Sequence, residues 1–122
     1  MINLVIWNEF LHEKENDQVK SIYPKGIHEC IKEFLSKDKE LSISTATLEE
    51  KDHGLSEELL EKTDVLIWWG HKAHKLVEDK IVDRIQQRVL EGMGLLVLHS
   101  GHHSKIFKRM MGTTANLRWA ER

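Results

Sequence analysis

DVLIWWG, at residues 64–70, is apolar from its second residue to its sixth. A run this short and this apolar, bounded by aspartate and glycine, favours a strand that is buried on both faces. INLVIW at residues 2–7 has the same character, LSISTATL at 41–48 alternates in part, and GLLVLHS at 94–100 predicts a further strand. Four strands are therefore expected.

The segments between these strands predict helices. After residues 2–7 comes a long polar stretch, NEFLHEKENDQVKSI, which is expected to be a functional loop. Pro24 then suits the first position of a helix. The apolar residues that follow recur at the spacing of one helix face, which also places Cys30 in the core: Ile27, Cys30, Ile31, Phe34 and Leu35.

Later helices carry clearer signals at their ends. Ser56 is expected to cap the helix in GLSEELLEK, and Leu55 with Leu60 to form a hydrophobic staple. Apolar residues at helical spacing predict a helix from about His74 to Glu91, ended by Gly92. KIFKRMM is expected to form a short last helix.

Strands thus alternate with amphipathic helices throughout. This order favours the α/β class, with a parallel sheet covered by helices on both faces. The sequence shows no internal repeat or linker. A single domain spanning residues 1–122 is expected.

Composition excludes several classes of function. The chain has 122 residues, 40% of them hydrophobic and 31% charged, with a net charge of -2. No basic surface for nucleic acid is expected, and no apolar run is long enough for a membrane span. The amino terminus lacks the pattern of a signal peptide, and the single cysteine fits a reducing compartment, so a cytoplasmic protein is expected. Neither GxGxxG nor GxxxxGK occurs, which predicts no nucleotide cofactor.

Histidine is the unusual component, with eight residues in a short chain. In open α/β sheets, ligands bind beyond the carboxyl ends of the strands. Most of the histidines are expected at that edge, whereas His53 is expected in a loop at the opposite end or the side of the sheet. The polar residues expected at the carboxyl edge are Asn8, Glu9, His12, Glu13, His28, His71, His74, His99, Ser100, His102 and His103.

Imidazole is a common ligand for divalent metals, and a catalytic zinc site uses three protein ligands. His71, His99 and His102 form the first candidate set, and His28 and His74 are further candidates for a zinc or manganese ion. A single histidine at a strand end often serves only to cap a helix or to donate to a carbonyl. The whole cluster favours a functional site over such separate roles.

Ser100 offers a different chemistry. It lies in HSGH, directly after a strand and before a turn, which is the setting of a nucleophile elbow. The sequence departs from GxSxG, so a serine hydrolase fits less well than metal or acid–base chemistry by histidines.

Three long stretches resemble the ThuA-like, or trehalose utilization, family: IWNEFLHEKENDQVKSIYPKGIH, DVLIWWGHKAH and GLLVLHSGHHSKIFKRMMGTTANLRW. The resemblance covers essentially the whole chain. It implies a flavodoxin-like three-layer sandwich related to the class I glutamine amidotransferases. It also implies a role in carbohydrate metabolism, on trehalose or related disaccharides or on 3-keto sugars.

The resemblance also implies what this chain lacks. The amidotransferase relatives carry a nucleophilic cysteine where this sequence has His99, so glutaminase activity is not expected. Family members are usually about twice as long, which implies that the chain corresponds to their amino-terminal half. Missing strands would expose apolar surface, and a homo-oligomer that covers it is expected.

The resulting hypothesis is an enzyme that processes a small sugar at a histidine-rich metal or acid–base site. His99, Glu9 and Glu13 are the candidate catalytic residues, and Asn8, His12 and Ser100 are candidates for binding the sugar. The alternative is a carbohydrate-binding module without catalysis, or a truncated and inactive product. Titration with disaccharides and keto-sugars would separate binding from turnover.

Overall fold

The described residues form a parallel sheet of four strands in the order β2-β1-β3-β4. A computed structural model describes residues 2–10, 14, 17–70, 73–98 and 104–111. The strands are β1 (Ile2–Asn8), β2 (Leu41–Thr47), β3 (Val65–Trp69) and β4 (Gly94–Val97). The predicted α/β class is confirmed, and the strand order is that of the flavodoxin-like fold.

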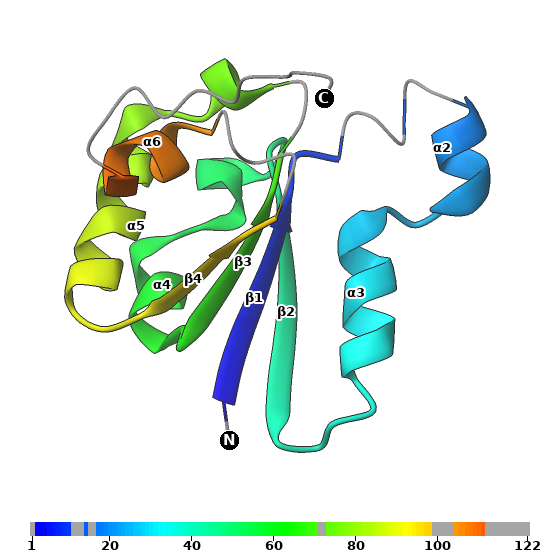
Figure 1. The fold of residues 1–122 in the computed structure, drawn as a ribbon, viewed down its shortest axis with the longest axis horizontal. Helices are drawn as coiled ribbons and strands as arrows, with labels where there is room; N and C mark the ends of the chain where they lie inside the picture. The colour runs from blue at the N-terminus through cyan, green and yellow to red at the C-terminus, as the bar shows by residue number, and fades with distance from the viewer. Residues whose placement is uncertain (1, 11–13, 15–16, 71–72, 99–103, 112–122) are drawn as a thin grey trace, which may run out of the picture.

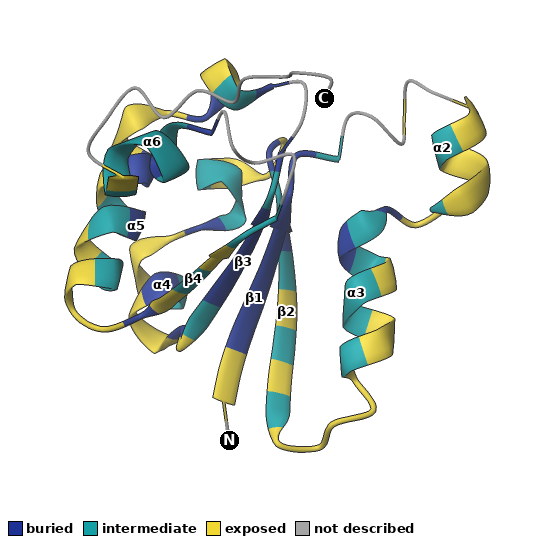
Figure 2. Cartoon of the chain, in the orientation of Figure 1, coloured by how far each residue is buried: buried dark blue, intermediate teal, exposed yellow. Residues whose placement is uncertain are grey.

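The two central strands are apolar because both of their faces are covered. Alternate residues of a strand point to opposite faces. Leu4 and Ile6 belong to the cluster on one face, whereas Val5 and Trp7 belong to the cluster on the other. Figure 2 shows β1 and β3 as the most buried strands. The continuous apolar runs in the sequence are the consequence of this double cover.

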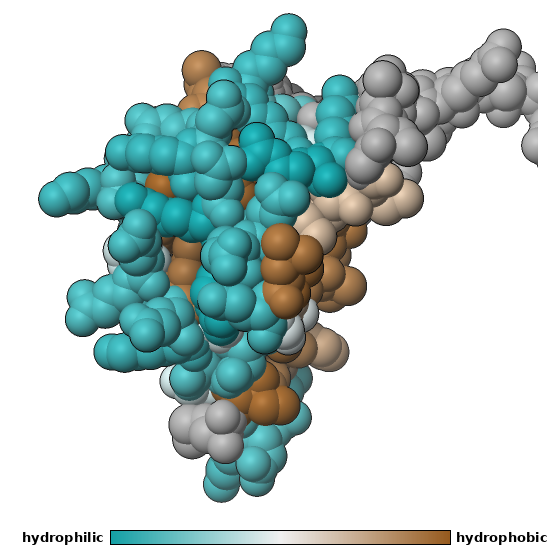
Figure 3. Space-filling model, turned by 90° about the vertical axis from the view of Figure 1, so that its left-hand side faces the viewer, coloured by the Kyte–Doolittle hydropathy of each residue, from teal (hydrophilic) through white to brown (hydrophobic). Residues whose placement is uncertain are grey.

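Helices lie on both sides of the sheet (Figure 1). The helix α3 (Ile27–Leu35) packs Ile31 and Leu35 against one face. The opposite face is covered by α4 (Glu57–Lys62), α5 (Asp79–Leu90) and α6 (Lys105–Met111). Figure 3 shows that the outer surface on this side is mainly hydrophilic, with apolar side chains gathered toward one side of the view.

The signals around α4 are confirmed, whereas those around α3 are partly wrong. Ser56 Oγ accepts a hydrogen bond from the backbone N–H of Leu59 at 3.1 Å. The helix α3 does not begin at Pro24, because Gly26 is its N-cap. Cys30 is exposed rather than in the core, and Phe34 is 69% exposed. The face of α3 that packs is shifted toward His28, so both side chains fall on its flank.

Three other boundaries differ from the sequence prediction. A helix, α2 (Asp17–Ile22), lies within the stretch expected to be a loop, and it buries none of its residues. The helix expected from His74 is divided into a 3₁₀ turn, His74–Leu76, and α5. The strand β4 ends at Val97, and residues 99 and 100 of the predicted strand lie outside the described part of the chain.

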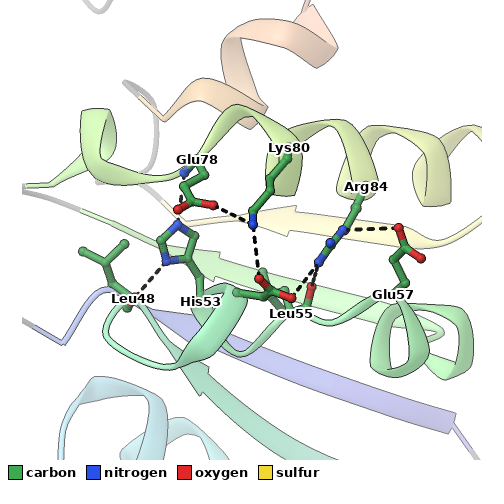
Figure 4. Close-up of polar contacts among 8 residues, drawn as sticks. Leu48, His53, Leu55, Glu57, Glu78, Lys80 and Arg84 are labelled. Carbon is green, nitrogen blue, oxygen red and sulfur yellow. Dashed lines mark hydrogen bonds and ion pairs between the residues drawn. The ribbon is translucent and has the colours of Figure 1, made fainter.

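His53 does not lie at the opposite end of the sheet. It follows the carboxyl end of β2, in the 3₁₀ turn Lys51–Gly54. The backbone N–H of Glu78 donates to His53 Nε2 at 3.0 Å, so Nδ1 is the nitrogen that donates to the carbonyl of Leu48 at 2.8 Å. Figure 4 shows the ring between these two partners. His53 therefore ties the loop after β2 to the start of α5.

The neighbouring Asp52 forms ion pairs with Lys80 and Arg84 of α5 at the same junction. The Arg84 guanidinium, which bonds the carboxylate at 3.3 Å, and the Lys80 ammonium lower the pKa of Asp52 below its ordinary value of 3.8. A lowered pKa in the folded state stabilises the fold above the unfolded pKa, and this contribution is lost as the pH falls through the folded pKa.

Asp52→Asn is therefore expected to lower the stability at neutral pH, and its difference from the wild type should shrink as the pH falls below about 4. Asparagine tolerates the positive φ of 53° at this position, so the backbone cost is small. Urea unfolding at a series of pH values measures the difference. A gap between the two proteins that stays constant down to acid pH would contradict the assignment.

Some large apolar side chains remain exposed in the described part of the chain. Leu96 on the edge strand β4 is 53% exposed, and Ile2 is 46% exposed. The expected homo-oligomer remains a prediction. No helix among the described residues has the length and apolarity that a membrane span requires.

Candidate functional site

The described residues of the predicted site follow β1 and β3, the two strands at the switch point of the sheet, or lie at the start of α3. The strands β1 and β3 are neighbours, but the helices that follow them, α3 and α5, cover opposite faces. Such a switch point, at the carboxyl edge of the strands, is where open α/β sheets bind ligands. Asn8, Glu9 and Gly70 lie at this edge.

A buried pair of side chains joins β1 to α3. Asn8 ends β1 and is fully buried, and His28, in the first turn of α3, is 6% exposed. The side-chain nitrogen of Asn8 lies 2.9 Å from His28 Nδ1. The backbone N–H of Phe10 donates to the Asn8 side-chain oxygen at 3.1 Å. The amide thus holds both the imidazole and the chain that leaves β1.

Gly26 makes room for this pair. It is the N-cap of α3 and has a φ of +96°. A Cβ there would lie 2.4 Å from His28 Cε1 and 2.4 Å from Phe10 Cε2. The two rings meet edge to face with their centroids 4.9 Å apart. Only glycine fits both the backbone conformation and the space.

Gly26→Ala is expected to destabilise the fold by about 2–4 kcal/mol, the sum of a positive-φ cost and an overpacking cost. Gly92→Ala is the matched control, because Gly92 has a φ of +118° and a Cβ there would meet nothing within 4 Å. The control therefore measures the backbone cost alone. Chemical unfolding of the two variants separates the backbone cost from the cost of the close contact. Equal losses of unfolding free energy would show that the contact with the His28 ring has no cost.

Glu9 links the end of β1 to the loop after β3. Its side chain is 1% exposed, and one carboxylate oxygen accepts a hydrogen bond from the backbone N–H of Ala73 at 2.9 Å. A Cβ added at Gly70 would lie 3.6 Å from the same carboxylate oxygen and 3.2 Å from His74 Nδ1. The carboxylate and this imidazole therefore approach the same glycine, and the absence of a side chain at Gly70 leaves them room.

The structure brings together Asn8 with His28, and Glu9 with the loop that carries His74. These four were predicted from the sequence, and their roles in catalysis and binding remain predictions. Phe10, Gly26, Gly70 and Ala73 were missed. The two glycines gave a sequence signal, because each stands between a predicted strand or turn and a polar cluster. The remaining predicted site residues lie outside the described part of the chain: His12, Glu13, His71, His99, Ser100, His102 and His103.

The described residues do not by themselves form a metal site. Among them, no three histidine, cysteine, aspartate or glutamate side chains gather closely enough to hold an ion. The predicted zinc or manganese site thus depends on residues outside this part of the chain.

A cavity of about 700 Å³ lies away from the switch point, between α4 and α5. Its basic side chains are engaged with the protein itself. Arg88 donates to the carbonyls of Leu60 and Thr63, at 2.7 and 3.0 Å, and so holds the last turn of α4. Arg84 donates to the carbonyl of Leu55 at 3.3 Å. These contacts join the two helices, so the two arginines have a structural role.

The sheet order, the cover on both faces and the polar switch point define an α/β domain of the flavodoxin-like class. Within that class, the chain matches the model of the ThuA family, described as trehalose utilisation, over residues 3–121. The chain belongs to this family, which links it to trehalose utilisation. No curated protein matches the sequence.

Proposed function

We propose that the chain acts on a small sugar, a disaccharide or a keto-sugar, at the carboxyl edge of the sheet. The observation that carries this proposal is that the Asn8–His28 pair and Glu9, which contacts the loop of Ala73 and His74, both lie at the carboxyl edge of the sheet in a ThuA-family domain. Sugars present hydroxyl and carbonyl oxygens, which such polar side chains bind through hydrogen bonds.

Proton transfer is the chemistry that the described residues support. Glu9 is buried near Gly70, which His74 also approaches, and it is held in place by the N–H of Ala73. A positioned carboxylate can take a proton from a sugar hydroxyl or from a carbon beside a carbonyl, and can return it later. His99 and Glu13 are the further candidates for this role. A metal held by His71, His99 and His102 would polarise the sugar oxygens, and the proposed proton transfer does not depend on it.

A carbohydrate-binding module without catalysis is the second candidate. The observation that favours it is that the side chains of Asn8 and Glu9 accept hydrogen bonds from the backbone of Phe10 and Ala73. These bonds position the loops of the site. Such a site can hold a sugar without transforming it.

One experiment separates the two functions. The purified protein is titrated with trehalose and with its 3-keto derivative, in parallel with product analysis and elemental analysis for zinc and manganese. Saturable binding with turnover is expected for the enzyme. Binding without turnover would establish the module, and the lack of any binding to either sugar would overturn both.

A further inference from the structure

The orientation of the Asn8 amide is fixed by its two neighbours. A backbone N–H can only donate, so the atom of Asn8 that faces the N–H of Phe10, at 3.1 Å, must be the oxygen. The nitrogen of the same amide then faces His28 Nδ1 at 2.9 Å. Reversing the amide would set two N–H donors against each other at Phe10.

This orientation decides where His28 carries its proton. An amide nitrogen donates and does not accept, so Nδ1 of His28 must accept the hydrogen bond. A neutral imidazole with an accepting Nδ1 has its hydrogen on Nε2. Turning the ring by half a turn would place a C–H group against the Asn8 N–H and lose the bond. The Phe10 ring, which meets the imidazole edge to face with a centroid distance of 4.9 Å, also restrains it.

We propose that Asn8 fixes His28 as the Nε2–H tautomer, which makes His28 a hydrogen-bond donor of the site and removes it from the set of metal ligands. A metal-binding histidine needs a lone pair on the ligating nitrogen and usually donates its other N–H to a carboxylate or a carbonyl. Here the partner of the other nitrogen is itself a donor, so the arrangement is reversed. Asn8 is a positioning residue in this scheme.

The Nε2–H group suits an oxygen acceptor. Toward a sugar, it would donate to a carbonyl or hydroxyl oxygen, and this part of the inference rests on the proposed function. The tautomer itself does not, because it follows from contacts within the protein. The two can therefore fail separately, since the tautomer is measured without any sugar.

The test is nitrogen NMR of the ¹⁵N-labelled full chain, in which long-range couplings from the ring hydrogens distinguish the two tautomers. The His28 signals are assigned by their loss in His28→Gln. The wild type is expected to show Nε2–H for His28. A hydrogen on Nδ1 would overturn the proposal, and this reading needs no variant of Asn8.

Asn8→Asp tests the cause. A carboxylate only accepts, so the hydrogen facing it must move to Nδ1. That change restores the usual arrangement of a metal-binding histidine, and any zinc affinity that the wild type shows is expected to rise by about ten- to a hundredfold. Asn3→Asp is the charge control, because it adds the same charge at the other end of β1. It also loses the hydrogen bond from Asn3 Nδ2 to the Lys62 carbonyl, but it should change neither the tautomer nor the zinc affinity.

Three results would overturn the proposal. In a folded Asn8→Asp protein, a hydrogen that stays off Nδ1 would show that Asn8 does not set the tautomer. In a protein whose wild type binds zinc, no gain in affinity after the tautomer has switched would show that the tautomer does not exclude His28 from the ligands. Coordination of zinc by His28 Nε2 in the wild type would contradict the proposed donor role directly.

Discussion

Glu9→Gln is expected to lower the turnover of a keto-sugar by about 10²- to 10⁴-fold, which is the usual contribution of a general acid or base. The substitution keeps the size of the side chain and an oxygen that can still accept the N–H of Ala73. The fold should therefore survive while proton transfer is lost. Steady-state kinetics, with thermal unfolding of the same samples, measures the two effects separately.

Glu50→Gln is the control for this substitution. Glu50 also accepts a backbone N–H, from Thr47 at 2.8 Å, but it does so after β2 and away from the switch point. It should leave turnover unchanged. If Glu9→Gln keeps turnover within a few-fold of the wild type, Glu9 serves only to hold the Ala73 loop. In that case Glu13 or His99 becomes the candidate proton carrier.

The sheet could be predicted from the sequence because its two central strands are buried on both faces. Continuous runs such as INLVIW have one structural meaning in an alternating α/β chain. The helix α2 could not be predicted in the same way. It buries none of its residues, so it has no apolar period that a sequence pattern could reveal.

The errors in α3 have a related cause. Ile27, Cys30, Ile31 and Phe34 all fit one apolar face, but periodicity does not say which part of that face meets the sheet. Packing is centred on the side of His28, Ile31 and Leu35, which leaves Cys30 exposed. The burial of His28 is part of the same packing.

Part of the candidate site was predictable because position after a strand fixes it. Asn8 and Glu9 follow β1, and the carboxyl ends of parallel strands meet at one edge. Their partners were not predictable. The N–H of Ala73 reaches Glu9 across 64 positions of sequence, and that contact depends on the register of β1 against β3.

Trp7→Ala is expected to cost about 3–5 kcal/mol of unfolding free energy, which is the usual loss for a buried tryptophan. Trp7 and Trp68 stack across β1 and β3 with ring centroids 3.8 Å apart and an angle of 9° between the planes. Each side chain is 1% exposed. They lie at the carboxyl ends of β1 and β3, so their stacking stabilises the strand ends that carry the candidate site.

Two phenylalanine variants separate the contribution of ring packing from that of the indole hydrogen bond. Both lose the indole stack, but their hydrogen bonds differ. Trp7 Nε1 donates to the carbonyl of His53 at 3.0 Å, whereas Trp68 Nε1 has no partner among the described residues. Trp7→Phe should therefore cost about 1 kcal/mol more than Trp68→Phe, because it leaves a carbonyl without its donor.

Urea unfolding of the three variants measures the order of their stabilities. A Trp68→Phe protein that is less stable than Trp7→Phe would contradict the expectation. The expected order would show that the His53 loop is held by one indole N–H, while the other tryptophan contributes through packing alone.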